Sequence, residues 1–167
     1  MRLDRYIAKS RIIEITSENL NGALTELLTV STAKLQEELP VRKIANQLMS
    51  REKTMTTYLG NGVAMPHIRV KIKRPYIFAI GRVKEGIDFE GVREYNEVRL
   101  IFLLLASDIE KNYLNVLASL ARLFRDQDLV ENIVSAPDLK SFSERVFLGF
   151  KGLLAKPEKR QTRFNRI

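Results

Sequence analysis

The sequence predicts an α/β (α+β) fold, a three-layer sandwich in which a mixed, mostly parallel sheet is flanked by helices on both faces. Short runs rich in β-branched and aliphatic residues alternate along the chain with longer segments whose apolar residues recur at helical spacing. The 167 residues are enough to bury one sizeable core and too few for two domains of ordinary size. Strands that alternate with helices in one domain pack as a sheet covered on both faces.

The first third of the chain predicts one strand and two helices. Arg11–Ile15 is a short β-branched run, and Thr16-Ser17-Glu18 after it has the residue types of a helix cap. Apolar residues then recur at helical spacing from Leu20 onward. Pro40 opens a second helix, in whose first turn proline is tolerated, and this helix ends near Arg51-Glu52-Lys53. The apolar positions are Leu20, Leu24, Leu27 and Leu28 in the first helix and Val41, Ile44, Ala45, Leu48 and Met49 in the second.

Two apolar runs in the middle of the chain predict strands. Tyr76–Val83 and Val98–Ala106 are too short and too rich in β-branched residues for good helices. The second run is almost continuously apolar, so we expect it to be buried on both faces of the sheet. Glu85-Gly86 and Glu90-Gly91 mark the connection between the two strands.

The last third predicts three helices and a tail. Ile109–Asp126, Asp128–Val134 and Asp138–Phe150 have helical periodicity, and Ala136-Pro137 forms the turn before the last of them. We therefore place the domain at residues 1–150. Residues 151–167, with six Lys or Arg and one Glu, are expected to form a basic C-terminal tail or linker.

The composition excludes several classes of protein. Apolar residues make up 45% and charged residues 29%, as in ordinary soluble domains. The longest apolar run, Leu100–Ala106, is far shorter than a membrane span, and the N-terminus lacks a signal peptide, so we expect a cytoplasmic protein. With no cysteine and one histidine, thiolate catalysis and a multi-histidine metal centre are excluded. We expect neither a metal nor a cofactor.

The most unusual segment surrounds the single histidine. Glycines on both sides of Asn61 allow backbone with positive φ or the close approach of another molecule. Val63-Ala64-Met65 is a short apolar piece that could enter the sheet or form its edge, and Pro66 then fixes the backbone just before His67. The imidazole is therefore expected on a stiffened segment beside a permissive loop.

A histidine in this setting can act as a nucleophile toward phosphorus. Phosphoryl transfer needs little beyond positioning and positive charge around the phosphoryl oxygens. Arg51 offers a guanidinium suited to those oxygens, and Thr54 adds a hydroxyl donor nearby. The residues expected to bind the phosphate are Thr56, Thr57, Gly60, Asn61 and Gly62. A lone histidine can also be a purely structural residue, and the sequence leaves both interpretations open.

The residues from Arg51 to His67 resemble the active-site signature of the fructose/mannitol/nitrogen-regulatory class (type 2) of phosphotransferase system enzyme IIA domains. A polar residue, here Glu52, precedes a six-residue gap, then an aliphatic residue and a glycine, and finally an aliphatic-Ala-aliphatic-Pro-His block that ends at His67. The resemblance extends from about Ile12 to about Phe147. It implies that His67 is the phosphoryl acceptor, that Arg51 stabilises the phosphate, and that the donor is the histidine phosphocarrier protein.

Two positions differ from the usual pattern of that family. Ile68 stands where a small residue, commonly glycine, follows the active histidine, and it should crowd the site. Tyr113 stands where many members have a second histidine; a phenol can donate a hydrogen bond to a phosphoryl oxygen but does not titrate near neutral pH. Asn115 stands two residues further on.

Positive charge is the last feature of the sequence. The formal net charge is +8 and the pI is about 9.8, so an anionic partner has to be considered. Apart from the tail, the excess lies in a cluster formed by Arg69, Lys71, Lys73 and Arg74. The cluster can be a solvated turn, or it can attract an acidic partner or stabilise a phosphorylated histidine.

Three functions follow from these observations. The first is a phosphoryl carrier that passes phosphate from His67 to a transporter or uses it as a regulatory signal, and we favour regulation because no sugar-specific partner domain is visible. The second is a degenerate sensor or interaction module, which Ile68 and Tyr113 would fit. The third is a nucleic-acid-associated protein, because Met1–Ser10 resembles the opening of small RNA-binding S4 modules. No aromatic-rich binding motif accompanies that segment, so we do not expect nucleic acid as a partner.

Overall fold

The computed structural model describes residues 1–87 and 97–156. The predicted Glu90-Gly91 turn and residues 157–167 of the basic tail lie outside these ranges. The described residues form one sheet of six strands. The strands are β1 (Ile12–Glu14), β2 (Tyr58–Gly60), β3 (Val63–Ala64), β4 (His67–Val70), β5 (Tyr76–Ile87) and β6 (Val98–Ser107).

The sheet is organised around β6. Its strand order is β1-β5-β6-β3-β2, and β4 also pairs with β6, on the same side as β3. Three of the five pairings, β1–β5, β3–β6 and β4–β6, are parallel, whereas β5–β6 and β2–β3 are antiparallel. The sheet is thus mixed, as the sequence predicted. Neither β2 nor β4 was predicted.

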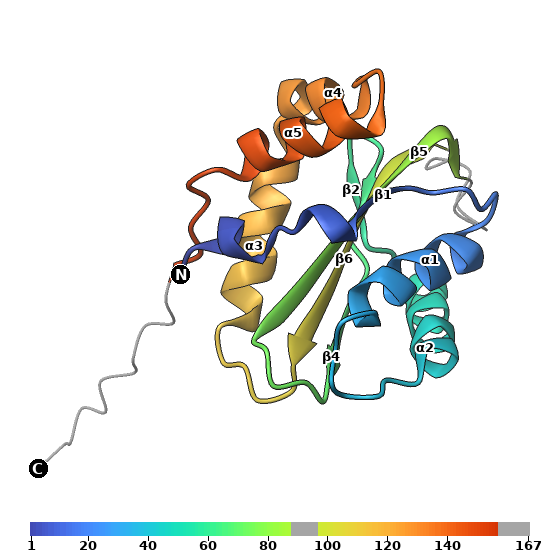
Figure 1. The fold of residues 1–167 in the computed structure, drawn as a ribbon, viewed down its shortest axis with the longest axis vertical. Helices are drawn as coiled ribbons and strands as arrows, with labels where there is room; N and C mark the ends of the chain where they lie inside the picture. Colours follow the sequence, from blue (N-terminus) through green and yellow to red (C-terminus); the bar gives the residue numbers. More distant parts are fainter. Residues whose placement is uncertain (88–96, 157–167) are drawn as a thin grey trace, which may run out of the picture.

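In the described ranges, five α-helices and two 3₁₀ turns cover the sheet (Figure 1). They are η1 (Leu3–Tyr6), η2 (Lys9–Arg11), α1 (Leu20–Thr32), α2 (Val41–Thr54), α3 (Tyr113–Phe124), α4 (Gln127–Val134) and α5 (Leu139–Phe150). Helices α1 and α2 pack on one face, and α3, α4, α5 and η1 pack on the other. The predicted three-layer sandwich is confirmed. No helix among residues 1–87 and 97–156 is long and apolar enough to span a membrane.

The side-chain alternation of β6 divides the interior into two cores. Phe102 and Leu104 face α3–α5, whereas the alternate residues Leu103 and Leu105 face α1 and α2. From Leu100 onward every residue of β6 is at most 2% exposed. The prediction of a strand buried on both faces is confirmed.

Local signals explain where the helices begin. The side chain of Asn19 accepts a hydrogen bond from Gly22 N, 2.8 Å away, so α1 is capped one residue after the predicted Thr16–Glu18 cap. Pro40 is the N-cap of α2, as expected from its position. The prediction that a helix starts at Ile109 was wrong. Ile109 is 81% exposed in the loop after β6, and α3 starts at Tyr113.

The two ends of the described chain are packed together. Leu3 is fully buried, and Met1 and Ala155 exchange backbone hydrogen bonds of 3.1 and 2.9 Å. Ala155 itself is 1% exposed. The N-terminal segment is therefore part of this domain's core rather than the start of a separate module, and the packing continues five residues beyond the predicted boundary at residue 150.

Candidate functional site

His67 lies where the chain re-enters the sheet. After β3 the chain leaves β6 at Met65 and Pro66, and β4 then pairs with β6 so that His67 is in register with Leu104. Pro66 has no N–H to donate, but its carbonyl oxygen accepts a bond of 3.0 Å from Leu104 N. The half-buried imidazole is therefore carried by the first residue of β4, and β6 holds the backbone both at Pro66 before it and along β4 after it.

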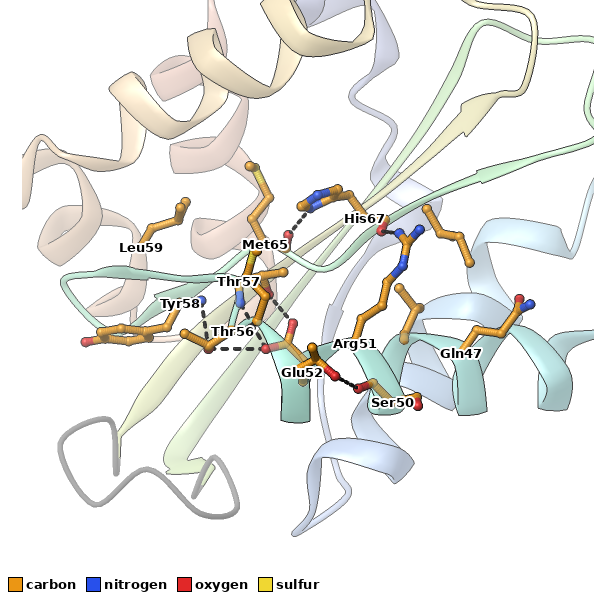
Figure 2. Close-up of a pocket in the computed structure, with 14 residues that line it drawn as sticks. Gln47, Ser50, Arg51, Glu52, Thr56, Thr57, Tyr58, Leu59, Met65 and His67 are labelled. Carbon is orange, nitrogen blue, oxygen red and sulfur yellow. Dashed lines mark hydrogen bonds between the residues drawn. The ribbon is translucent and has the colours of Figure 1, made fainter.

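The ring of His67 is oriented by its own backbone. Nδ1 lies 2.8 Å from the carbonyl oxygen of Met65, which can only accept, so the bond is made by a protonated Nδ1 (Figure 2). The neutral ring then carries its lone pair on Nε2. Met65 is itself held, because its N–H donates to Thr57 O at 3.1 Å. The geometry presents Nε2 as the nucleophilic atom.

Arg51 reaches the same strand end from the last turn of α2. Its Nη1 donates to the carbonyl oxygen of His67 at 3.2 Å, as the dashed line in Figure 2 shows. A guanidinium has five N–H donors, so four remain for another acceptor. The structure therefore places a positive charge beside the backbone of His67.

Glu52 organises the turn between α2 and β2 (Figure 2). Its carboxylate accepts bonds from Thr56 Oγ1 at 3.2 Å and Thr57 N at 2.9 Å, and a further bond from Thr57 Oγ1. Both threonine hydroxyls are therefore engaged with Glu52 and do not point freely toward His67. The sequence analysis assigned Glu52 only a position in the signature. The signal for its role in holding the turn is a carboxylate four and five residues before two threonines.

A cleft of about 720 Å³ lies between α2 and the strand ends. It contains Arg51, Thr56, Thr57 and His67, four of the predicted site residues. Its remaining lining is partly apolar: Gln47, Leu48, Ser50, Glu52, Thr54, Met55, Tyr58, Leu59, Met65 and Ile68.

The Gly60-Asn61-Gly62 loop has the predicted backbone but lies outside this cleft. All three residues have positive φ, of 92°, 55° and 74°. The Asn61 amide donates to the carbonyl oxygens of Phe124 and Arg125 at 3.1 and 3.3 Å, at the C-terminus of α3. The loop is thus a β2–β3 turn that ties the sheet to α3. The structure does not bring these three residues to His67, and this corrects their predicted place in the phosphate site.

Tyr113 lies next to the His67 ring, and Arg69 lies against Tyr113. The Tyr113 ring centroid is 6.0 Å from that of His67, with the planes at 63°. The Arg69 guanidinium carbon is 4.6 Å from the Tyr113 ring centroid. Burial raises the pKa of the Tyr113 hydroxyl, and the charges of Arg51 and Arg69 partly oppose this. Asn115 is turned away and donates to Asn112 Oδ1 at 2.9 Å.

Ile68 does not face the His67 ring. Successive residues of a strand point to opposite faces, so Ile68 packs into the core under α1 and α2, while His67 and Arg69 face α3. Ile68 also lines the cleft, as Arg51 does. The expected crowding therefore falls on the cleft wall and not on the ring.

Comparison with known proteins identifies the family. Residues 12–146 match the family model described as phosphoenolpyruvate-dependent sugar phosphotransferase system, EIIA 2. The chain belongs to this family. The type 2 enzyme IIA fold and the role of a phosphoryl carrier in transport or regulation therefore apply to it.

Regulatory and sugar-specific proteins are both among the relatives. The nitrogen regulatory protein of Bradyrhizobium diazoefficiens is 30% identical over 142 residues, which cover 84% of this chain and 92% of that protein. The fructose-specific EIIABC component of Bacillus subtilis is 24% identical over 140 residues, covering 81% of this chain and 21% of that protein.

Solved structures agree with this assignment. The nitrogen regulatory protein IIA-Ntr from Neisseria meningitidis matches with a TM-score of 0.71 and 25% identity, covering 87% of this chain and 98% of that one. The IIA mannitol structure from Escherichia coli matches with a TM-score of 0.64 and 19% identity, covering 84% and 98%, and supports the fold alone.

Proposed function

We propose that this enzyme IIA domain carries a phosphoryl group on Nε2 of His67, received from the histidine phosphocarrier protein. The observation that carries the proposal is the hydrogen bond between His67 Nδ1 and Met65 O, which leaves Nε2 as the basic nitrogen. The position of Arg51 beside the same strand end supports it, because a guanidinium suits phosphoryl oxygens in charge and shape.

The transfer needs no proton to leave His67. The Nε2 lone pair forms a bond to phosphorus while the P–N bond of the donor phosphohistidine breaks, and the donor nitrogen keeps that electron pair. Nδ1 retains its proton and its bond to Met65 O throughout. Arg51 binds an equatorial phosphoryl oxygen as charge redistributes. Thr56 and Thr57 serve by holding Glu52 and the cleft wall in place.

We further propose a regulatory use of the phosphoryl group in the cytoplasm, where phosphoenolpyruvate is made. A nitrogen regulatory protein is among the relatives and aligns over nearly its whole length. The target would be a regulatory protein or a transporter. The degenerate-module hypothesis stays as the alternative, because Tyr113 cannot relay a proton near neutral pH as a second imidazole would.

A phosphorylation assay tests the proposal. The full chain is incubated with radiolabelled phosphoenolpyruvate, enzyme I and the phosphocarrier protein. We expect one acid-labile, alkali-stable phosphoryl group per chain, and none in His67→Ala. Label that survives in His67→Ala would overturn the assignment of His67, and an unlabelled parent chain would favour the degenerate module.

A further inference from the structure

Two arginines, Arg51 and Arg69, lie near His67. Arg51 approaches from α2. Arg69 lies on β4 two residues after His67, so the side chains of His67 and Arg69 point to the same face of the sheet, the face covered by α3. The ring of Tyr113 is adjacent to both His67 and Arg69: its centroid is 6.0 Å from that of the imidazole and 4.6 Å from the Arg69 guanidinium carbon. Burial raises the pKa of the Tyr113 hydroxyl, and the positive charges of Arg51 and Arg69 both oppose that rise.

Neither of these guanidiniums forms an ion pair with a carboxylate in the described part of the chain. Among residues 1–87 and 97–156, the ion pairs join Arg2 to Asp4, Arg82 to Glu14 and Arg99 to Glu131. Arg51 and Arg69 each donate one bond to a backbone carbonyl, of His67 and of Asp108. The nearest carboxylate of the cleft, Glu52, is occupied by Thr56 and Thr57. The site therefore holds two positive charges with donors to spare.

We propose that Arg69, seated on the Tyr113 ring, is a second phosphate-binding residue that contacts the phosphoryl group on His67. This inference rests on the proposed phosphorylation of His67. A phosphoryl group carries up to two negative charges, which Arg51 and Arg69 together match. The contact with the Tyr113 ring holds the guanidinium on the same face of β4 as His67 and leaves N–H donors available for a phosphoryl oxygen.

The contact between Tyr113 and Arg69 has a functional consequence. In this chain a phenol occupies the position where many relatives have a titratable imidazole, but the side chain that contacts this phenol is a guanidinium, a group that stays protonated in proteins. The phosphorylated state is then stabilised by a fixed charge and not by protonation of a neighbouring ring. Such a site suits a phosphoryl group that is held as a signal.

The test measures the ionisation of the phosphoryl group itself. The full chain is phosphorylated chemically with phosphoramidate, and the pKa between phosphoryl monoanion and dianion is followed by ³¹P NMR. A guanidinium in contact favours the dianion, so Arg69→Gln should raise this pKa by about one unit or more. Arg69→Lys, which keeps the charge and loses the fork, should fall between the two.

Arg122→Gln is the matched control. Arg122 is also exposed, but it lies nine residues after Tyr113 on α3, about 13 Å along the helix axis. An unchanged phosphoryl pKa in Arg69→Gln would overturn the proposal, and so would an equal shift in both variants, which would reflect net charge alone. A chain that takes phosphate from phosphoramidate but not from the phosphocarrier protein would refute the proposed function while leaving the Arg69 contact intact. A chain that takes it from neither would refute both.

Discussion

The Nδ1 atom of His67 lies 2.8 Å from the carbonyl oxygen of Met65, two residues earlier in the chain. The bond closes a tight loop around Pro66, whose fixed φ limits how far the two residues can separate. Ring orientation and tautomer are therefore set by the backbone of the site and need no partner side chain.

This relationship predicts which nitrogen is phosphorylated. Because Nδ1 is occupied by the Met65 bond, the adduct should form on Nε2. Two-dimensional ¹H–¹⁵N spectra of the phosphorylated chain, with histidine labelled at both ring nitrogens, distinguish the two isomers. A phosphoryl group found on Nδ1 would mean that the bond to Met65 O is broken before transfer.

Arg51→Lys should slow transfer about tenfold or more, even though the charge is kept. A lysine offers a point charge in place of two parallel N–H donors. The measurement is the rate of phosphoryl transfer from the phosphocarrier protein at limiting concentration. Arg42→Lys, on the exposed first turn of the same helix, is the control and should transfer at the parent rate. Equal rates for Arg51→Lys and the parent chain would remove Arg51 from the site.

Substitutions at Tyr113 separate the two leading functions. If its hydroxyl donates to a phosphoryl oxygen, Tyr113→Phe should lose about 1–3 kcal/mol of stabilisation of the transferred group. Tyr113→His should restore or raise the rate, because an imidazole 6.0 Å from His67 returns a titratable group to the site. Parent rates in both variants would make Tyr113 a packing residue. If the parent takes no label and Tyr113→His does, the degenerate module becomes the better description.

Arg82 should matter for stability and not for chemistry. It is 2% exposed in β5, pairs with Glu14 on β1, and donates to the carbonyl oxygens of Val134 and Ala136. Arg82→Met would leave these acceptors without a donor, and we expect the free energy of unfolding to fall by about 3 kcal/mol.

Urea denaturation of Arg82→Met and Arg99→Met provides the comparison. Arg99 is on the neighbouring strand β6, but it is 38% exposed and its ion pair with Glu131 is 3.7 Å long. Its replacement should change the free energy of unfolding by about 0.5 kcal/mol or less. Similar losses in both variants would show that burial of Arg82 contributes nothing specific.

The layer order and the central strand could be predicted because they depend on patterns visible in the sequence. The continuous apolar run Leu100–Ala106 and the periodicity of the helices both follow from which side chains must leave water. The positive φ values at Gly60 and Gly62 were also predictable from the sequence, because glycine lacks the Cβ that makes this backbone conformation unfavourable in other residues.

The parts that were missed depend on contacts between distant segments. The strand β4 has four residues directly after a proline, and pairing with β6 alone makes it a strand. Asn61 was expected to bind the phosphate, but its amide donates a hydrogen bond to Phe124 O at the end of α3, 63 residues later in the chain. Burial of Arg82 likewise depends on carbonyl oxygens 52 and 54 residues later in the chain. No local pattern encodes such partners.

The position of β6 in the chain also sets the order in which the protein can be built during synthesis. Strands β3, β4 and β5 all precede β6 and all pair with it, and β4 has no other partner strand in the part of the chain that the structure describes. A nascent chain that stops before Val98 can form only the β1–β5 and β2–β3 pairs. The strand that carries His67 therefore remains unpaired until the ribosome has made residue 107, and the phosphoryl-accepting site is among the last parts of the sheet to be assembled.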